Sequence, residues 1–276
     1  MTNQFDPRYK LKPKFMPDPG AKKRNKYVVS HQKDVMSRIR RRPANIAFFE
    51  ALFDDPPVSS AKPTVGYFCN MIPVELIRAF GATPIRLGCG NAALVQSGEE
   101  VLTGDICPLC KASFAQFLDD ANPAMACDCL VIPTSCDAKK KLGEILSDFM
   151  PVFMLSLPTE QNYSRHARQA ASDIERLSDF LALNLKAKLS KTRLLEAIIL
   201  SNRRTMLVRA ILETRSAKPA SMSVRDLYIV IQSSFTGVSL ERWMEEAEAV
   251  LSEIRDFQPE RARMRPRIIL TGAPVI

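Results

Sequence analysis

Residues 65–91, VGYFCNMIPVELIRAFGATPIRLGCGN, decide the fold that this sequence predicts. They predict a short strand that ends at Cys69, then an apolar helix that opens at Pro73 and stops at Gly81, and a second strand over 84–87. A thiol between a strand and a helix lies at the carboxyl end of a sheet, the edge where open α/β sheets build their sites. Taken alone, Cys69 also fits a small buried hydrophobe, as free cysteines often are.

The same order of strand, cysteine and helix recurs downstream. Residues 127–146, CDCLVIPTSCDAKKKLGEIL, predict a strand over 129–133 and then a helix, with Asp137 or Ser135 as its N-cap. Residues 151–158 are a further strand-like run. Strands that alternate with helices at this spacing predict a parallel sheet with crossover helices. The fold class is therefore α/β, with a Rossmann-like parallel-sheet domain over residues 44–160.

A third junction lies between these two. Residues 104–120, GDICPLCKASFAQFLDD, predict a turn that leads through Cys107 into an amphipathic helix. Pro108 suits the first helical turn because its missing N–H would be unpaired there. Cys107 is therefore expected at a helix N-terminus, where the dipole and free N–H groups stabilise a thiolate or an anionic cluster. The preceding residues, 92–103, are polar and predict no regular element.

The rest of the globular part is predicted to be helical. One helix is expected over 45–53, and a helical subdomain over 161–262. The helices of the subdomain are expected over 163–185, 190–215, 223–235 and 239–257, with Trp243 in the core. Residues 263–276 predict a linker and then the first strand, 268–271, of a second α/β domain, and such a strand must dock on other structure.

The net charge of +9 is concentrated at the N-terminal end. Residues 1–42 hold 13 Lys and Arg and three Asp, a balance of +10, so the other 234 residues sum to −1. Residues 1–43 are therefore predicted to be a basic, solvated arm. The two basic clusters of the arm, KKRNK (22–26) and RIRRR (38–42), contain no aromatics to stack bases, which argues against a nucleic-acid partner.

Composition also bears on the compartment. No apolar run of about 18 residues occurs, so no membrane partner is expected. The first residues lack the apolar region of a signal peptide, so we expect a cytoplasmic protein. In that reducing compartment the seven cysteines are expected to be thiols, metal ligands or catalytic groups rather than a disulfide framework.

Two groupings of these cysteines are compatible with their spacing. In the first, Cys107 and Cys110 form a C-x-x-C, and Cys127 and Cys129 form a C-x-C, so that four thiolates hold zinc or an iron–sulfur cluster. In the second, Cys69, Cys107 and Cys136 each lie at a strand–helix junction on one sheet edge and converge on an iron–sulfur cluster. The first grouping corresponds to a non-catalytic cysteine-rich module with a structural zinc or no metal.

Three motifs in order resemble a known family. CNMIPVELIRAFGATPIRL (69–87), CPLCK (107–111) and VIPTSCDAKKKL (131–142) resemble the 2-hydroxyacyl-CoA dehydratases, whose family also contains benzoyl-CoA reductase subunits and double-cubane-cluster reductases. The helical region and the terminal PRIILTGAP resemble the family in the same order. Beside the cysteines, the residues that support the motifs are Pro73, Glu75, Lys111, Asp137 and Lys139.

The resemblance implies a cofactor and its ligands. Family members bind an oxygen-sensitive iron–sulfur cluster, 4Fe-4S or double cubane, between two α/β domains, and they are enzymes of anaerobic metabolism. The cysteines equivalent to Cys69 and Cys107 are cluster ligands. Cys136 and Cys110 rank below them, and Cys110 replaces a usually aliphatic residue, so we expect it to be a packed thiol. The resemblance assigns no catalytic residue, and nothing indicates a flavin or nicotinamide.

The resemblance also implies an activity and partners. The family passes one low-potential electron into an acyl-CoA thioester, and an ATP-hydrolysing iron–sulfur activator protein supplies that electron. The third cluster cysteine of the family lies in the second α/β domain, which would begin near residues 267–274. We therefore expect either a subunit completed by a homologous or second-domain chain, or a truncated form.

Overall fold

The computed structural model describes residues 42–54, 62–88, 90–102, 104–117, 127–157, 163–216 and 221–256. Contacts group the chain into two units. One contains Val58–Leu194, and the other contains Val29–Pro57 and Leu195–Ile276. The strand predicted over 268–271 and the predicted arm up to residue 41 lie outside the described residues. The domain boundaries proposed from the sequence stay a prediction.

The first unit is built on a four-stranded parallel sheet. Its order is β2 (Thr83–Leu87), β1 (Thr64–Phe68), β3 (Cys129–Pro133) and β4 (Val152–Leu155). Gly66 in β1 lies opposite Ile85 of β2 and Leu130 of β3. Every residue of β1 and β3 is buried, as expected for central strands of a sheet that is covered on both faces. The predicted α/β fold is confirmed, as are all four predicted strands of this sheet.

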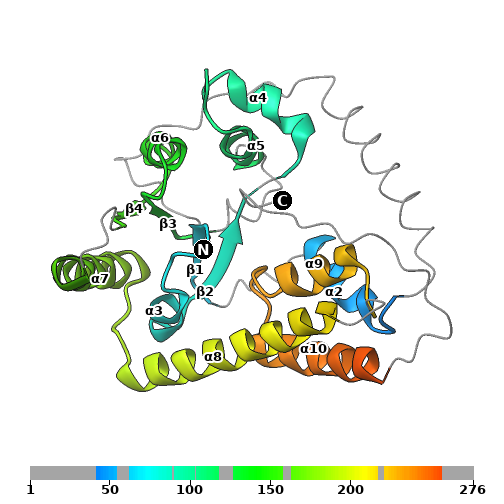
Figure 1. Cartoon of the computed structure of the whole chain (residues 1–276). Coiled ribbons are helices and arrows are strands. Elements are labelled where there is room, and N and C mark those ends of the chain that lie inside the picture. The colour runs from blue at the N-terminus through cyan, green and yellow to red at the C-terminus, as the bar shows by residue number, and fades with distance from the viewer. Residues whose placement is uncertain are drawn as a thin grey trace. The chain divides into compact units, whose positions relative to one another are not determined.

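Helices cover both faces of this sheet (Figure 1). On one face lie α5 (Pro108–Phe117) and α6 (Asp137–Leu146), whose Phe114 and Leu142 pack in one core with Leu130 and Ile132 of β3. The other face carries α3 (Val74–Ala79) and α7 (Tyr163–Leu185). There Phe153 of β4 meets Phe180 of α7 with ring centroids 5.4 Å apart. Because side chains alternate along a strand, each strand supplies both cores.

Residues 92–99 form helical structure that the sequence did not predict. A 3₁₀ turn, η1 (Ala92–Leu94), opens with the Asn91 side chain accepting from the Ala93 N–H at 3.0 Å, and α4 (Val95–Glu99) follows. Gly98 permits close packing of α4 on α5, since a Cβ there would lie 1.9 Å from the Lys111 carbonyl oxygen. So short a helix depends on tertiary packing rather than on local propensity.

The second unit is helical. It contains α2 (Ile46–Asp54), the part of α8 (Lys191–Glu213) from residue 195, η3 (Thr214–Ser216), α9 (Val224–Ser233) and α10 (Leu240–Arg255). Trp243 is fully buried in its core, and its indole N–H donates to the Val230 carbonyl (2.9 Å) and the Ser233 hydroxyl (3.1 Å). The helices predicted here, and the core position of Trp243, are confirmed.

The last basic residue of the predicted arm is an ion-pair partner in this unit. The Arg42 guanidinium donates to Asp226 at 2.6 Å and to Glu50 at 2.7 Å. Asp226 is fully buried in the first turn of α9, where it also accepts from the hydroxyl of the N-cap Ser223 at 2.9 Å. A buried carboxylate at a helix N-terminus needs such partners to remain ionised.

None of the helices in the described ranges is both long and apolar enough to cross a bilayer.

Candidate functional site

The strand order creates a crevice at the carboxyl edge of the sheet. From β1 the chain crosses to β2 on one side, and it later returns to β3 on the other side. Ligand sites of open α/β sheets form at this kind of switch point, outside the carboxyl ends of the two central strands. Cys69 directly follows β1, and Cys136 lies three residues after β3. Two of the predicted site residues are thus placed on this edge.

Cys69 has an unusual backbone. Its φ of 68° is in the left-handed region, which costs a non-glycine residue about 1–2 kcal/mol. The next residue, Asn70, accepts a hydrogen bond from Arg86 of β2 at 3.1 Å, which ties the turn to the neighbouring strand. The Cys69 side chain is partly exposed. Strained residues of this kind cluster at functional sites, so the conformation marks Cys69 as a candidate.

The helix after Cys69 begins as the sequence suggests. Pro73 is the N-cap of α3, and its carbonyl accepts from the Leu76 N–H at 3.0 Å. Glu75 lies in the first turn, where a carboxylate complements the positive end of the helix dipole. The helix ends before Gly81, whose φ of 81° is left-handed. Pro73 and Glu75 therefore serve to set the start of α3 close to Cys69.

Cys107 is exposed and directly precedes α5. Its carbonyl accepts from the N–H groups of Cys110 (2.9 Å) and Lys111 (3.2 Å) in the first turn. Pro108 is the first residue of the helix, as predicted. An exposed thiol at the start of a ten-residue helix is accessible both to ligands and to reagents.

Lys111 holds the turn that carries Cys107. Its side chain is 5% exposed, and the ammonium donates to Glu99 of α4 at 2.6 Å and to the Gly104 carbonyl at 2.9 Å. It therefore joins α4, α5 and the turn at residue 104. The family motif included this lysine, but its role in joining these three segments was not predicted from the sequence. The signal in the sequence that could have indicated a buried lysine is the position of Lys111 among the apolar residues of one helix.

Cys136, and not Asp137 or Ser135, is the N-cap of α6, so the capping prediction was wrong. Its backbone is extended (φ −159°, ψ 162°), and its carbonyl accepts from the Lys139 and Lys140 N–H groups, both at 3.1 Å. The thiol makes no capping hydrogen bond, because sulfur is a weak acceptor. Asp137 instead lies in the first turn, where its charge complements the helix dipole.

Three of the thiols share one neighbourhood. Cys110 is 5% exposed and packs against the core side chains beneath α5. Burial, and after it negative charge at Cys107 and Cys136, raise the pKa of Cys110 to about 12, whereas Lys139 acts in the opposite direction. The structure thus places Cys107, Cys110 and Cys136 close together.

The four-cysteine grouping does not form a metal site in the structure. Cys129 is fully buried in β3, on the face opposite Leu130, whereas Cys110 packs with Leu130. Burial raises the pKa of Cys127 to about 12 and that of Cys129 still higher, which keeps both thiols protonated. Within the described ranges, no three His, Cys, Asp or Glu side chains are arranged to hold a metal ion.

Cys69 and Cys107 fit an iron–sulfur cluster in kind. Thiolates are its usual ligands, and both sulfurs are at least partly accessible. The pair supplies only two ligands, and the described residues add no third donor that would complete a group able to hold a metal ion. A cluster held by this pair would take its other ligands from outside the described residues.

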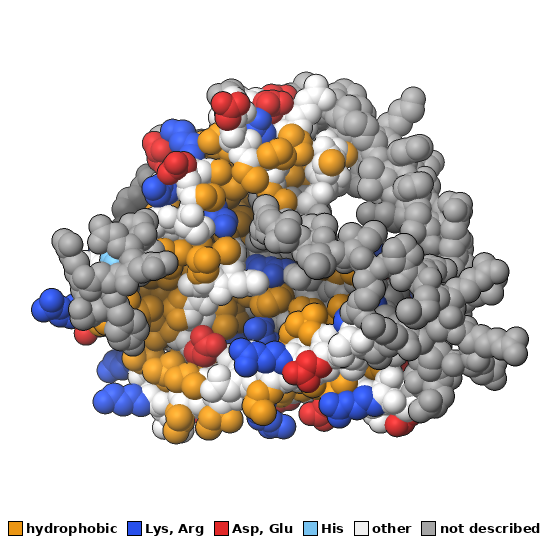
Figure 2. All heavy atoms as spheres, in the orientation of Figure 1, with side chains coloured by type: hydrophobic (Ala, Val, Ile, Leu, Met, Phe, Trp, Pro, Cys, Tyr) orange, Lys and Arg blue, Asp and Glu red, His pale blue; other side chains and the backbone are white. Residues whose placement is uncertain are grey.

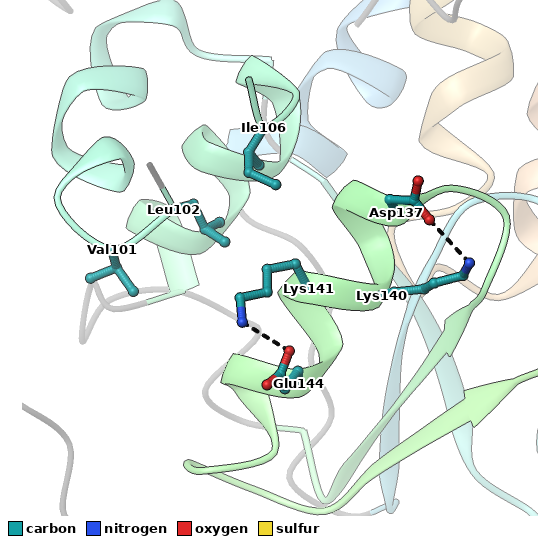
Figure 3. Close-up of a pocket in the computed structure, with 7 residues that line it drawn as sticks. All are labelled: Val101, Leu102, Ile106, Asp137, Lys140, Lys141 and Glu144. Carbon is teal, nitrogen blue, oxygen red and sulfur yellow. Dashed lines mark hydrogen bonds and ion pairs between the residues drawn. The ribbon is translucent and has the colours of Figure 1, made fainter. Parts of the chain in front are cut away.

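An open groove lies beside this region, with a volume of about 440 Å³. Figure 3 shows its apolar side chains facing α6, where Asp137 pairs with Lys140 and Lys141 pairs with Glu144, both at 3.0 Å. The apolar wall consists of Val101, Leu102 and Ile106. The groove combines an apolar surface with cations. The sequence did not predict it, because its two walls come from segments about 35 residues apart.

Comparison with protein families matches residues 69–276 to the 2-hydroxyglutaryl-CoA dehydratase D-component. This match covers most of the chain. The chain belongs to this family. Among curated proteins, the chain is 27% identical over 216 residues to the "Putative dehydratase subunit YjiM" of Escherichia coli (strain K12). That alignment covers 77% of this chain but only 56% of YjiM. The family resemblance inferred from the three motifs is confirmed.

Proposed function

We propose that this chain is the iron–sulfur subunit of an oxygen-sensitive 2-hydroxyacyl-CoA dehydratase or acyl-CoA reductase, with Cys69 and Cys107 as cluster ligands. The observation that carries the proposal is Cys69 itself: it has a left-handed backbone and a partly exposed thiol at the carboxyl end of a central strand. A glycine would adopt that backbone with less strain, so an L-residue there needs a reason in its side chain.

The chain's own residues would position the two thiols. Asn70 and Arg86 fix the turn at Cys69, and Lys111 fixes the turn at Cys107. Cys107 also lies beside the N-terminus of α5, where free N–H groups and the dipole favour an anionic group. When bound, the cluster would supply a single low-potential electron for reduction of a thioester.

The groove beside α6 supports the binding of an acyl-CoA. Its apolar wall suits an acyl or pantetheine chain, and phosphate groups would compete with Asp137 and Glu144 for Lys140 and Lys141. The proposed partners are an ATP-hydrolysing iron–sulfur activator and a homologous or second-domain chain that supplies the remaining ligands.

The test is anaerobic purification of the 276-residue chain, with and without its neighbouring subunit, followed by iron and sulfide analysis and visible absorption. We expect iron and acid-labile sulfide in similar amounts, with both reduced strongly in Cys69→Ala and in Cys107→Ala. Cys127→Ala is the matched control, because it removes a buried thiol that we do not assign to the site.

Two results would reject the proposal. One is stoichiometric zinc without iron that is lost in Cys127→Ala and Cys129→Ala. The other is an iron content in Cys69→Ala and Cys107→Ala that equals that of the unsubstituted chain, since neither thiol would then be a ligand. Circular dichroism of each variant checks that the fold is kept.

A further inference from the structure

Cys107 and Cys110 form a pair whose members differ in environment. Cys107 is exposed, whereas Cys110 lies three residues later and is 5% exposed. The Cys110 N–H donates to the Cys107 carbonyl at 2.9 Å, so the two residues lie within one turn of each other. An accessible thiol with a buried thiol behind it, on the first turn of one helix, is the arrangement that thiol–disulfide exchange uses.

We propose that Cys107 and Cys110 form a reversible disulfide, which makes the start of α5 a thiol–disulfide exchange site for low-molecular-weight disulfides. Residues three apart on a helix have Cβ atoms about 5–6 Å apart, whereas a disulfide needs about 3.5–4.5 Å. Cys107 precedes the helix, so its backbone can close this gap without breaking the helical hydrogen bonds. The Cys110 N–H to Cys107 carbonyl bond of 2.9 Å already holds the two residues within one turn.

The reaction is balanced by the reagent disulfide. The thiolate of Cys107 attacks one of its sulfurs, its S–S bond breaks, and the first small thiol leaves. Cys110 then loses its proton and displaces the second small thiol from Cys107, which forms the Cys107–Cys110 bond. The cysteine pair loses two electrons and two protons, and the reagent is reduced to two thiols.

The neighbouring side chains favour this pairing over another. Cys136 is also exposed, but it is the N-cap of α6 and so belongs to a different helix from the pair. Cys127 is buried and receives a hydrogen bond from the Gly66 backbone. Cys110 is therefore the resolving thiol that Cys107 meets first.

The disulfide has a consequence that rests on the proposed function. Because a metal ligand must be a free thiolate, the bond would withdraw Cys107 from the cluster site until a thiol reduces it. The exchange would then protect the empty site from irreversible oxidation of Cys107. The formation of the bond itself does not depend on iron.

The test uses the metal-free full chain equilibrated with reduced and oxidised glutathione, quenched with acid and alkylated. Cleavage before aspartate releases residues 105–118, whose only cysteines are Cys107 and Cys110. We expect the oxidised peptide to carry no alkyl groups and to be two hydrogen atoms lighter than the unalkylated dithiol. In Cys110→Ser, Cys107 should instead persist as the glutathione mixed disulfide at least about tenfold longer, because the resolving thiol is no longer tethered beside it.

Control variants separate the possible outcomes. Cys136→Ser and Cys127→Ser should both leave the Cys107–Cys110 bond intact. A Cys107–Cys136 link in the unsubstituted chain, a persistent mixed disulfide at Cys107, or no oxidation at all would overturn the inference. If the disulfide forms but anaerobically prepared chain binds no iron, the proposed function fails and this inference stands.

Discussion

Lys111 and Glu99 provide the most informative test of how the Cys107 turn is held. Their ion pair of 2.6 Å is asymmetric, because the lysine side chain is 5% exposed and the glutamate side chain is 52% exposed. Lys111 has one further bond, to the Gly104 carbonyl at 2.9 Å. Removing the lysine therefore returns a carboxylate to water, whereas removing the glutamate leaves a buried ammonium with one neutral acceptor.

The expected costs follow from this asymmetry. Lys111→Met loses the bond to Gly104 and a half-exposed ion pair but keeps the packing of the side chain, which together is about 1–2 kcal/mol. Glu99→Ala leaves the buried charge unpaired and should cost about 3 kcal/mol. The double variant leaves no buried charge without a partner, so its cost should be close to that of Lys111→Met alone. The coupling between the two sites then equals the cost of Glu99→Ala alone, about 3 kcal/mol.

The assay is urea unfolding of the full chain and the three variants, followed by far-ultraviolet circular dichroism. Fluorescence of Trp243 is unsuitable as the main probe, because this residue is the only tryptophan and lies in the core of the second unit. Hydrogen exchange of the amides in residues 95–117 would show whether the loss is local to α4 and α5.

The reasoning would be refuted if Glu99→Ala cost no more than Lys111→Met, or if the two costs were additive. Glu99→Gln is the matched control, since it keeps an acceptor for the ammonium while it removes the negative charge. We expect its cost to lie between those of the unsubstituted chain and Glu99→Ala. An equal cost for Gln and Ala would assign the whole effect to charge.

Three further predictions concern the same unit. In urea unfolding, the free energy of unfolding of Cys69→Gly should exceed that of Cys69→Ala by about 1 kcal/mol, because glycine accepts the φ of 68°. Equal stability of the two variants would show that the strain is absent. Since burial raises the pKa of Cys110 and of Cys127 to about 12, the folded chain keeps protons that the unfolded chain releases above about pH 8.5. The contribution of these thiols is thus fully present below that pH and is lost as the pH rises toward 12, and Cys110→Ala should flatten the decline measured by urea titrations across this range. Gly98→Ala should destabilise α4 by more than about 2 kcal/mol, because its Cβ would lie 1.9 Å from the carbonyl oxygen of Lys111, and proteolysis near residue 98 should rise.

Figure 2 shows that apolar side chains remain on the described surface next to charged ones. Several belong to the exposed side of α8, including Leu195, Ile199 and Met206, which are 52–70% exposed. Their buried counterparts on the same helix, Ala197 and Leu207, lie on the opposite side. Because α8 has apolar residues on two faces, periodicity does not predict which face is buried, although the length and helical state of α8 were predicted from the sequence.

The sequence by itself determined the local elements and the family. Alternating apolar runs, Pro108 at a helix start and Gly81 after a helix end are signals written within a few residues, because caps and helical periodicity depend on near neighbours. The three motifs around Cys69, Cys107 and Cys136 likewise identified the family that the comparison over residues 69–276 shows. Linear order was enough for both.

Only the tertiary structure decided which groups meet. The burial of Lys111, the helical state of α4 and the burial of Cys110 all arise where separate segments pack together. The same packing removed Cys129 from the metal-site candidates by enclosing it in β3. Burial and distance are properties of the folded chain, and spacing along the sequence fixes neither of them.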